Sequence, residues 1–158
     1  MKIMVLGGVG WIGSTLTKVL AEHADVDEVV IGDLDEAKSR QLIADIGAGK
    51  VTYRKVDVYD HESMVSAMKG MDSVANALWY EFAVRVTEAA IDAGVPLTDL
   101  GGMPELTKQQ LGYDERAKAA GILNIIGCGE TPGISNVLAR WGADRMDRPK
   151  KALAASDT

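Results

Sequence analysis

The chain of 158 residues is 47% hydrophobic and 25% charged, a composition typical of one globular domain with a sizeable core. Its net charge of −6 argues against nucleic acid or an anionic membrane surface as a partner. The single cysteine excludes an internal disulfide, and no apolar run is long enough to span a membrane, so we expect a cytoplasmic protein.

Strand-like and helix-like patterns alternate along the chain. We expect strands at residues 2–6, 28–31, 51–56, 73–77, 97–99 and 123–126. Helices are expected at residues 10–22, 36–46, 62–69, 81–93, 108–120 and 133–145. Repeated strand–helix units predict an α/β fold whose parallel sheet is covered by helices on both faces. The predicted architecture is a Rossmann-type doubly wound sheet in the order 3-2-1-4-5-6, with the ligand at the carboxyl ends of the strands.

Several helix ends and buried faces are predicted from local residues. The expected helix starts are an N-cap at Asp35, a capping box from Thr107 to Gln110, and Pro132 in the first turn behind Thr131. Apolar residues at helical spacing predict three buried stripes. They are Ile12, Leu16, Val19 and Leu20; Phe82, Val86, Ala89, Ala90 and Ala93; and Ile134, Val137, Leu138 and Trp141.

A glycine cluster follows the first strand and opens the first helix, in the pattern Gly8-x-Gly10-x-x-Gly13. In this context Gly8 allows a tight turn, Gly10 lets the backbone approach a pyrophosphate, and Gly13 lets the helix pack closely. The helix N-terminus, with Trp11 and Ile12, offers unpaired N–H groups and a partial positive charge to phosphates. The pattern therefore predicts a dinucleotide site, with an ordinary strand–helix turn as the alternative.

Asp33 ends the second strand 20 residues after Gly13, where a carboxylate that binds the adenosine ribose is expected. Its charge suits the ribose hydroxyls of NAD and repels the 2′-phosphate of NADP. NAD is therefore the expected cofactor, with Leu34 beside its adenosine. NADP stays open as an alternative, because Lys38 and Arg40 could offset the charge of Asp33. A capping or loop carboxylate is the other interpretation of Asp33.

The ends of the third and fourth strands carry further candidate cofactor contacts. Asp57 and Val58 follow the third strand and are expected to flank the adenine, although Asp57 also suits a solvated turn. Asn76 and Ala77 end the fourth strand, where the nicotinamide half of the cofactor should lie. A helix cap is the other interpretation of Asn76.

The candidates for the substrate side of the site are Trp79, Tyr80 and Asp99. Large aromatic residues after a strand are as often simple packing residues. We find no credible general base and no metal site in the sequence. The two histidines, His23 and His61, are expected to face solvent, and Cys128 is expected to be a buried small residue.

The glycines also fit the spacing Gly7-x-x-Gly10-x-x-Gly13, which resembles the short-chain dehydrogenase/reductase pattern. That family uses a Tyr four residues before a Lys. The four tyrosines of this chain are followed at that offset by Asp57, Ser63, Val84 and Ala117. A catalytically active member of that family is therefore not expected.

Several blocks, in order and spacing over residues 1–145, resemble the saccharopine dehydrogenase and lysine 6-dehydrogenase family. The first blocks are the glycine cluster at residues 8–13 and Asp33. They are followed by Asn-Ala-Leu-Trp-Tyr-Glu-Phe at residues 76–82 and Ala-Ala-Ile-Asp-Ala-Gly-Val at 89–95. Thr-Asp-Leu-Gly-Gly follows at 98–102, and the last block runs from Gly127 to Asn136. The resemblance implies hydride transfer between a nicotinamide cofactor and a C–N bond of an amino acid.

The resemblance also bears on domain organisation. Residues 1–145 would form the dinucleotide-binding domain, and residues 146–158 a short tail at the start of a second domain that the sequence lacks. A small-molecule amino acid is the implied substrate, and a homo-oligomer is a further expectation. Two hypotheses follow: the dinucleotide domain of an amino-acid oxidoreductase, or a module that binds the dinucleotide without turnover.

Overall fold

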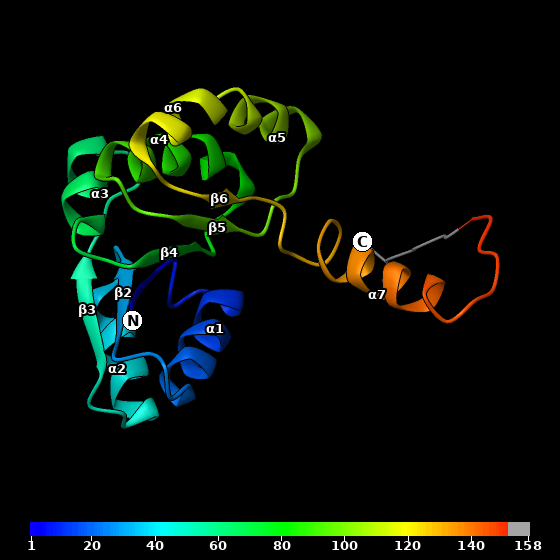
Figure 1. Cartoon of the computed structure of the whole chain (residues 1–158). Coiled ribbons are helices and arrows are strands. Elements are labelled where there is room, and N and C mark those ends of the chain that lie inside the picture. The colour runs from blue at the N-terminus through cyan, green and yellow to red at the C-terminus, as the bar shows by residue number, and fades with distance from the viewer. Residues whose placement is uncertain (152–158) are drawn as a thin grey trace.

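The computed structural model describes residues 1–151 and shows one parallel sheet of six strands between layers of helices (Figure 1). The order β3-β2-β1-β4-β5-β6 confirms the predicted topology. The strands are β1 (Lys2–Leu6), β2 (Glu28–Asp33), β3 (Val51–Lys55), β4 (Ser73–Asn76), β5 (Leu97–Asp99) and β6 (Asn124–Ile125). Residues 152–158, which make up half of the predicted tail, lie outside the described residues.

Helices cover the two faces of the sheet unequally (Figure 1). On one face α1 (Trp11–Glu22) and α2 (Glu36–Ile46) pack on β1, β2 and β3. The layer on the other face is α3 (His61–Met68), α4 (Ala83–Ala93), α5 (Pro104–Leu111) and α6 (Asp114–Ala120), with α4 packed on β4 and β5. A short 3₁₀ turn (Tyr80–Phe82) leads into α4, and α7 (Ile134–Ala143) projects away from the body.

Two apolar clusters form the core, one on each face of the sheet. Under α3 and α4, Met4, Leu6, Val74 and Leu97 of the strands meet Val86 of α4. The predicted stripe on α4 is confirmed, because its central alanines are fully buried and Phe82 and Ala93 pack against the same cluster. Under α1 and α2 the second cluster is built from alternate residues of β1 and β2, whose near-continuous apolar runs suit a sheet buried on both faces.

The sheet register brings the carboxyl ends of four strands to one level. Leu6 pairs with Gly32 on one side and with Asn76 on the other, and Asn76 pairs with Asp99. The residues that follow β1, β2, β4 and β5 therefore lie along one edge of the sheet. This edge is where ligands bind in open parallel sheets.

Of the three helix starts predicted from local residues, only one is confirmed. Asp35 caps α2 as predicted, since its carboxylate accepts a hydrogen bond from the Lys38 amide at 2.9 Å. The capping box at Thr107 is wrong, because α5 begins three residues earlier at Pro104. The helix start at Pro132 is also wrong, because α7 begins at Ile134 with Gly133 as its N-cap.

The helix predicted at residues 108–120 is instead two helices, α5 and α6, separated by Gly112 and Tyr113. The predicted buried stripe on α7 is also wrong, and the one on α1 is right only in part. On α1 the predicted Leu16 and Leu20 pack against the core, while Ile12 and Val19 are about half exposed. The fully buried residues of this helix are Gly13, Thr17 and Ala21. On α7 all four stripe residues are more than half exposed, because the helix stands off the body. No helix of residues 1–151 is long and apolar enough to cross a membrane.

Candidate functional site

The turn after β1 is closed by its first glycine. Gly7 has a φ of +69°, and its carbonyl accepts a hydrogen bond from the Gly10 amide at 3.0 Å. The tight turn therefore depends on Gly7 and not on Gly8, which corrects the role predicted for Gly8. Gly8 instead packs against β2, because an added Cβ would lie 3.0 Å from the Ile31 side chain.

The other two glycines of the cluster, Gly10 and Gly13, have the geometry that the sequence predicts. A Cβ on Gly13 would lie 2.0 Å from the Gly7 carbonyl oxygen, so only glycine lets α1 start this close to the turn. Gly10 is the N-cap of α1, and an added Cβ there would have the Gly7 oxygen at 3.2 Å as its only neighbour within 4 Å. The turn therefore leaves open space in front of Gly10, at the N-terminus of α1, where a phosphate group would fit.

Replacing Gly13 with Ala is expected to lower the free energy of unfolding by about 2 kcal/mol, within the range of about 1–3 kcal/mol for an overpacked site. The clash outweighs the better helix propensity of Ala. Gly49→Ala is the matched control, because its added Cβ meets no atom within 4 Å. Urea unfolding measures both variants, and a Gly13→Ala chain as stable as the parent would contradict the tight contact between helix and turn.

Asp33 lies directly beside the glycine turn. One carboxylate oxygen accepts a hydrogen bond from the Val9 amide at 3.4 Å, and the other accepts one from the Asp35 amide at 3.0 Å. The Tyr53 hydroxyl donates to the Asp33 carbonyl at 3.2 Å, and burial raises the pKa of this tyrosine. The fold thus brings the glycine turn after β1 and Asp33, the acid predicted to bind the ribose, together.

A small apolar cavity of about 90 Å³ opens beside Asp33. Its lining residues come from the ends of β1, β2 and β3 and from the turn after β4: Leu6, Gly32, Asp33, Leu34, Val56, Val58 and Leu78. Leu34 and Val58, both predicted to lie beside the adenosine, thus line one cavity with Asp33. Asp57 is not among the lining residues, and its carboxylate accepts a hydrogen bond from the Tyr59 amide at 2.9 Å within its own loop.

The end of β4 adds an amide and an aromatic pair. Asn76 is buried, and its side-chain oxygen accepts a hydrogen bond from the Leu78 amide at 3.1 Å, which fixes the turn that Ala77 begins. The Trp79 and Tyr80 rings lie 4.6 Å apart in a tilted stack. Tyr80 packs against Gly102 of the loop after β5, while Trp79 stays 62% exposed. The pair therefore forms an aromatic surface between the loops after β4 and β5.

Asp99 is only 2% exposed, and its carboxylate forms hydrogen bonds inside the protein. One oxygen accepts hydrogen bonds from the amides of Gly101 and Gly127, both at 2.9 Å, and the other accepts one from the Gln110 side chain at 2.5 Å. This placement contradicts the expectation that Asp99 faces a substrate. The carboxylate instead joins the loops after β5 and β6 to α5, and Gln110 continues the network to Thr87 of α4 at 3.0 Å.

Asp99→Ala is expected to destabilise the chain by about 3 kcal/mol, because the amides of Gly101 and Gly127 lose their acceptor and the Gln110 side chain keeps only its hydrogen bond to Thr87. Asp99→Asn is the matched control, since its side-chain oxygen can still accept from both glycine amides; it should lose about half as much. Thermal unfolding of the two variants tests this, and equal losses would contradict the assigned hydrogen bonds.

The remaining candidates lie away from this edge or are exposed. Cys128 is exposed, so the prediction that it is buried is wrong. His23 and His61 face solvent as predicted, and His61 lies 3.0 Å from Asp92 of α4. Within residues 1–151, no group of three or more His, Cys, Asp and Glu side chains is placed to hold a metal ion.

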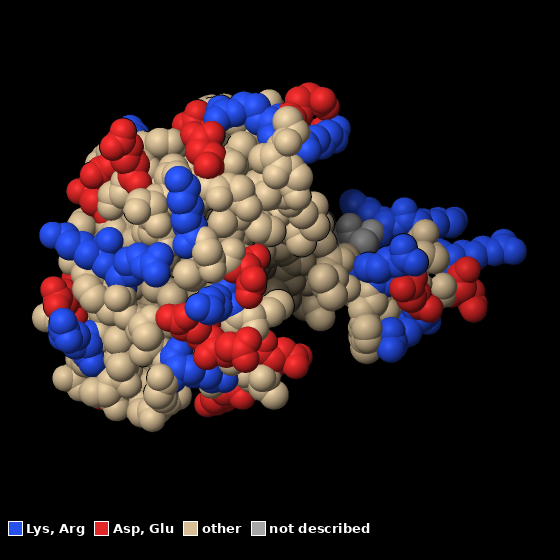
Figure 2. Space-filling view, turned by 60° about the vertical axis from the view of Figure 1, so that its left-hand side comes forward, with Lys and Arg blue, Asp and Glu red and all other residues tan. Residues whose placement is uncertain are grey.

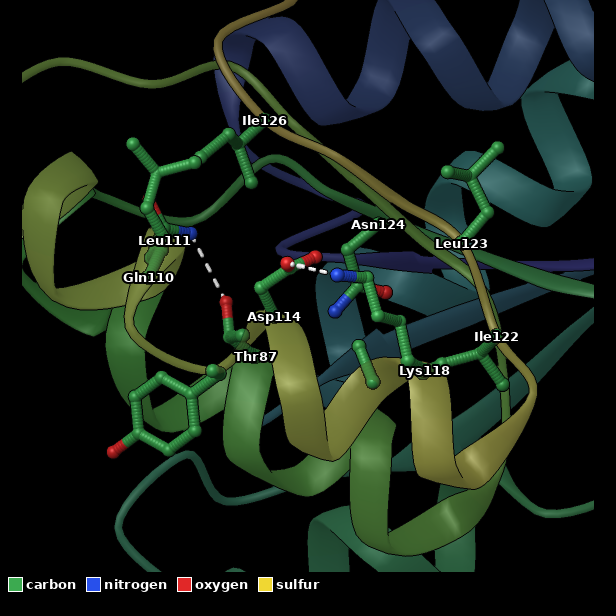
Figure 3. Close-up of a pocket in the computed structure, with 11 residues that line it drawn as sticks. Thr87, Gln110, Leu111, Asp114, Lys118, Ile122, Leu123, Asn124 and Ile126 are labelled. Carbon is green, nitrogen blue, oxygen red and sulfur yellow. Dashed lines mark hydrogen bonds and ion pairs between the residues drawn. The ribbon is translucent and has the colours of Figure 1, made fainter.

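A larger cavity, of about 250 Å³, lies between α4, α5, α6 and β6 (Figure 3). Gln110 and Thr87 line it, so the hydrogen-bond network of Asp99 reaches its wall. The side-chain oxygen of Asn124 is buried there without a hydrogen-bond partner. This cavity contains none of the predicted cofactor residues, and the candidate site remains the edge with the glycine turn and Asp33.

Sequence reasoning missed three residues of the site. Gly7 provides the turn, Leu78 lines the cavity beside Asp33 and touches Gly7, and Gln110 holds Asp99. Gly7 could have been found from the second glycine spacing, which includes it. Leu78 and Gln110 carry no such signal, because their roles depend on contacts between segments far apart in the sequence.

Comparison with known proteins identifies the family of the chain. The chain matches the family model described as the saccharopine dehydrogenase NADP-binding domain over residues 3–125. Carboxyaminopropylagmatine dehydrogenase of Synechocystis is 29% identical over 89% of this chain and 37% of that protein. Carboxynorspermidine synthase of Vibrio alginolyticus is 28% identical over 89% of this chain and 38% of that protein.

Solved structures show the same fold. Apo saccharopine dehydrogenase of Saccharomyces cerevisiae superposes with a TM-score of 0.76 at 21% identity, over 91% of this chain and 31% of that one. The chain thus spans well under half the length of these relatives. Because the family model covers most of the sequence, the chain belongs to the family of saccharopine dehydrogenase NADP-binding domains.

Proposed function

We propose that the carboxyl edge of the sheet binds a nicotinamide dinucleotide through the glycine turn after β1, Asp33, Leu34 and Val58. The pyrophosphate lies over Gly10 at the N-terminus of α1, the adenosine ribose at Asp33, and the adenine between Leu34 and Val58. The observation that carries this proposal is the hydrogen bond between Asp33 and the Val9 amide, since it joins acid and glycine turn at one site. The fit of the chain to the cofactor rests on the open space before Gly10 and the apolar cavity beside Asp33.

We further propose that NAD is preferred to NADP, although the family is described by NADP. Asp33 places a carboxylate where the 2′-phosphate of NADP would lie. The two nearby cations are already paired: Lys38 lies 2.9 Å from Asp35, and Arg40 lies 2.6 Å from Glu36. Hydrogen bonds from Lys38 hold the pKa of Asp35 below its usual value, and Asp35 raises the pKa of Lys38. Both cations would have to leave these partners to bind a phosphate.

The preference should amount to roughly tenfold to thirtyfold in affinity. Like charges 4 Å apart repel by about 4 kcal/mol at an effective dielectric constant of 20, and exposure and salt reduce this to about 1–2 kcal/mol. Asp33→Ser should narrow the gap, mostly by weakening NAD and partly by admitting NADP. Calorimetry that measures the dissociation constants of NAD and NADP, for the unchanged chain and for Asp33→Ser, tests this prediction. Equal affinity of the unchanged chain for NAD and NADP would show that Lys38 or Arg40 binds the phosphate.

The wider activity we propose is hydride transfer between the nicotinamide and a C–N bond. The names of the two relatives describe carboxyalkyl derivatives of amines, and the relative of known structure is a saccharopine dehydrogenase. An amino acid, or an amine with a carboxyalkyl group on nitrogen, is therefore the substrate class we propose. The exposed aromatic surface of Trp79 and Tyr80 lies at the end of β4, on the nicotinamide side of the edge, and is the proposed substrate contact.

A second function is favoured by the position of Asp99. Its carboxylate is buried and fully hydrogen bonded, so it does not serve as a general base at the edge. A module that binds the dinucleotide without turnover needs no such base. This alternative applies to the 158-residue chain by itself.

A further inference from the structure

One charged side chain is buried, and the proposed function makes no use of it. Of the Asp, Glu, Lys and Arg side chains in residues 1–151, only the carboxylate of Asp99 lies inside the body. Elsewhere acidic and basic side chains are interspersed over the surface of the body (Figure 2), where water and salt screen them. A buried charge is screened much less, so Asp99 can act on a ligand without touching it.

The hydrogen bonds of Asp99 show that this carboxylate is ionised. One oxygen accepts two glycine amides, and the other accepts the side-chain amide of Gln110. The Gln110 amide also donates to the Thr87 hydroxyl (Figure 3), because that hydroxyl donates its own proton to the Ala83 carbonyl at 2.9 Å. All three hydrogen-bond partners of the carboxylate are therefore donors, which leaves no acceptor for a proton on Asp99.

No cation neutralises this charge. Within residues 1–151, none of the salt bridges includes Asp99. Since only 2% of the side chain is accessible, a group outside the body could not bring a cation into contact with it. Buried carboxylates are usually paired with a cation, because burial of an unpaired charge costs free energy. The three hydrogen bonds offset that cost, but they leave a net negative charge beneath the edge of the sheet.

The charge lies on the nicotinamide side of the edge. Asp99 ends β5 and pairs with Asn76, the last residue of β4. The loop that Asp99 holds also reaches the aromatic pair, because a Cβ on Gly102 would lie 2.7 Å from the Tyr80 side chain. Adjacent strands are about 4.8 Å apart, so the carboxylate lies roughly one or two strand spacings from that side. By contrast Asp33 ends β2, and β1 and β4 lie between β2 and β5.

We propose that the buried charge of Asp99 makes the site prefer the oxidised nicotinamide to the reduced one. This inference rests on the proposed dinucleotide site. The nicotinamide ring is positively charged in NAD⁺ and neutral in NADH, and the two molecules are otherwise nearly alike. A negative charge about 10 Å away, at an effective dielectric constant of about 20, favours the cation on the order of tenfold. Asp99 therefore acts through its field and not by contact.

A preference of this kind lowers the midpoint potential of the bound cofactor. For a two-electron couple, a tenfold tighter hold on the oxidised form lowers that potential by about 30 mV. The buried charge thus favours the direction in which a C=N bond is reduced, with the hydride going to carbon and a proton from water to nitrogen.

Calorimetry with NAD⁺ and NADH on the purified chain tests the proposal. The ratio of the two dissociation constants, NADH over NAD⁺, should fall about tenfold in Asp99→Asn, mostly through weaker binding of NAD⁺. Asp72→Asn is the matched control, because Asp72 lies just before β4, at the opposite end of the sheet, and its carboxylate also accepts a backbone amide, that of Lys2 at 2.7 Å. Its ratio should equal that of the parent chain. An unchanged ratio in a folded Asp99→Asn chain overturns the proposal.

A second control separates the charge from the packing of the loops. Thr87→Val removes the other hydrogen-bond partner of Gln110 and leaves the charge of Asp99 in place. It should lower the melting temperature and yet keep the parent ratio to within about twofold. A fall in the ratio as large as that in Asp99→Asn would show that loop position and not charge sets the preference, and would overturn the proposal.

The unchanged chain provides a test that needs no folded variant. It should bind NAD⁺ more tightly than NADH. Binding of both forms with NADH the tighter overturns this inference alone, and the dinucleotide site stands. Failure to bind either form overturns the proposed dinucleotide site together with this inference.

Discussion

Gly10→Val is expected to abolish dinucleotide binding, with a loss of affinity of at least about a hundredfold. A valine side chain would fill the space in front of the turn, where we place the pyrophosphate. The fold should survive, because Gly10 has extended backbone angles that valine can adopt and its only close neighbour is the Gly7 oxygen at 3.2 Å. Calorimetry with NAD measures the affinity, and circular dichroism confirms the fold.

Gly49→Val is the control for this prediction. Gly49 lies in the turn before β3, with open space around it, and is not among the cavity-lining residues at Asp33. Its affinity for NAD should equal that of the parent chain. A folded Gly10→Val chain that binds NAD as tightly as the parent would show that the pyrophosphate does not lie over this turn.

The second expected result is that the purified 158-residue chain binds cofactor but turns over L-lysine and saccharopine poorly. General acid–base groups contribute about 10²–10⁴ to such rates, and neither Asp99 nor His61 is placed to act as one at the edge. Asp99 is buried and hydrogen bonded, and His61 lies against Asp92 of α4. Production of NADH with each substrate is followed by absorbance, beside a binding titration on the same preparation.

Rapid, substrate-dependent production of NADH would contradict this prediction and would show that the chain supplies its own base. Asp99→Asn then becomes the informative variant. It retains the oxygen that accepts the Gly101 and Gly127 amides but removes the charge. Loss of turnover in that variant would assign the base to Asp99, and unchanged turnover would exclude it.

The fold was predictable because its signals are local. Buried parallel strands need continuous apolar runs such as residues 28–31, and glycine must stand where a helix starts against a turn, as at Gly13. Asp33 was predictable for the same reason, since its distance from the glycines is set by one strand–helix–strand unit. These features depend on segments that are neighbours along the chain.

Features that depend on distant segments were not predictable. The spacing of Ile134, Val137, Leu138 and Trp141 shows that one face of α7 is apolar, but it does not say which surface, if any, that face contacts. The position of Asp99 at a strand end places it at the edge. Its inward orientation depends on Gly127, which lies 28 residues further along.

The central claim is that the edge with the glycine turn and Asp33 holds the dinucleotide, and amide NMR of the 16.8 kDa chain during titration with NAD tests it most directly. We expect the largest shifts at Gly8, Gly10 and Gly13, at Asp33 and Leu34 and at Val58, with the amides that line the larger cavity, such as Leu111 and Lys118, unchanged. Shifts confined to that cavity, or none at millimolar NAD, would contradict the account.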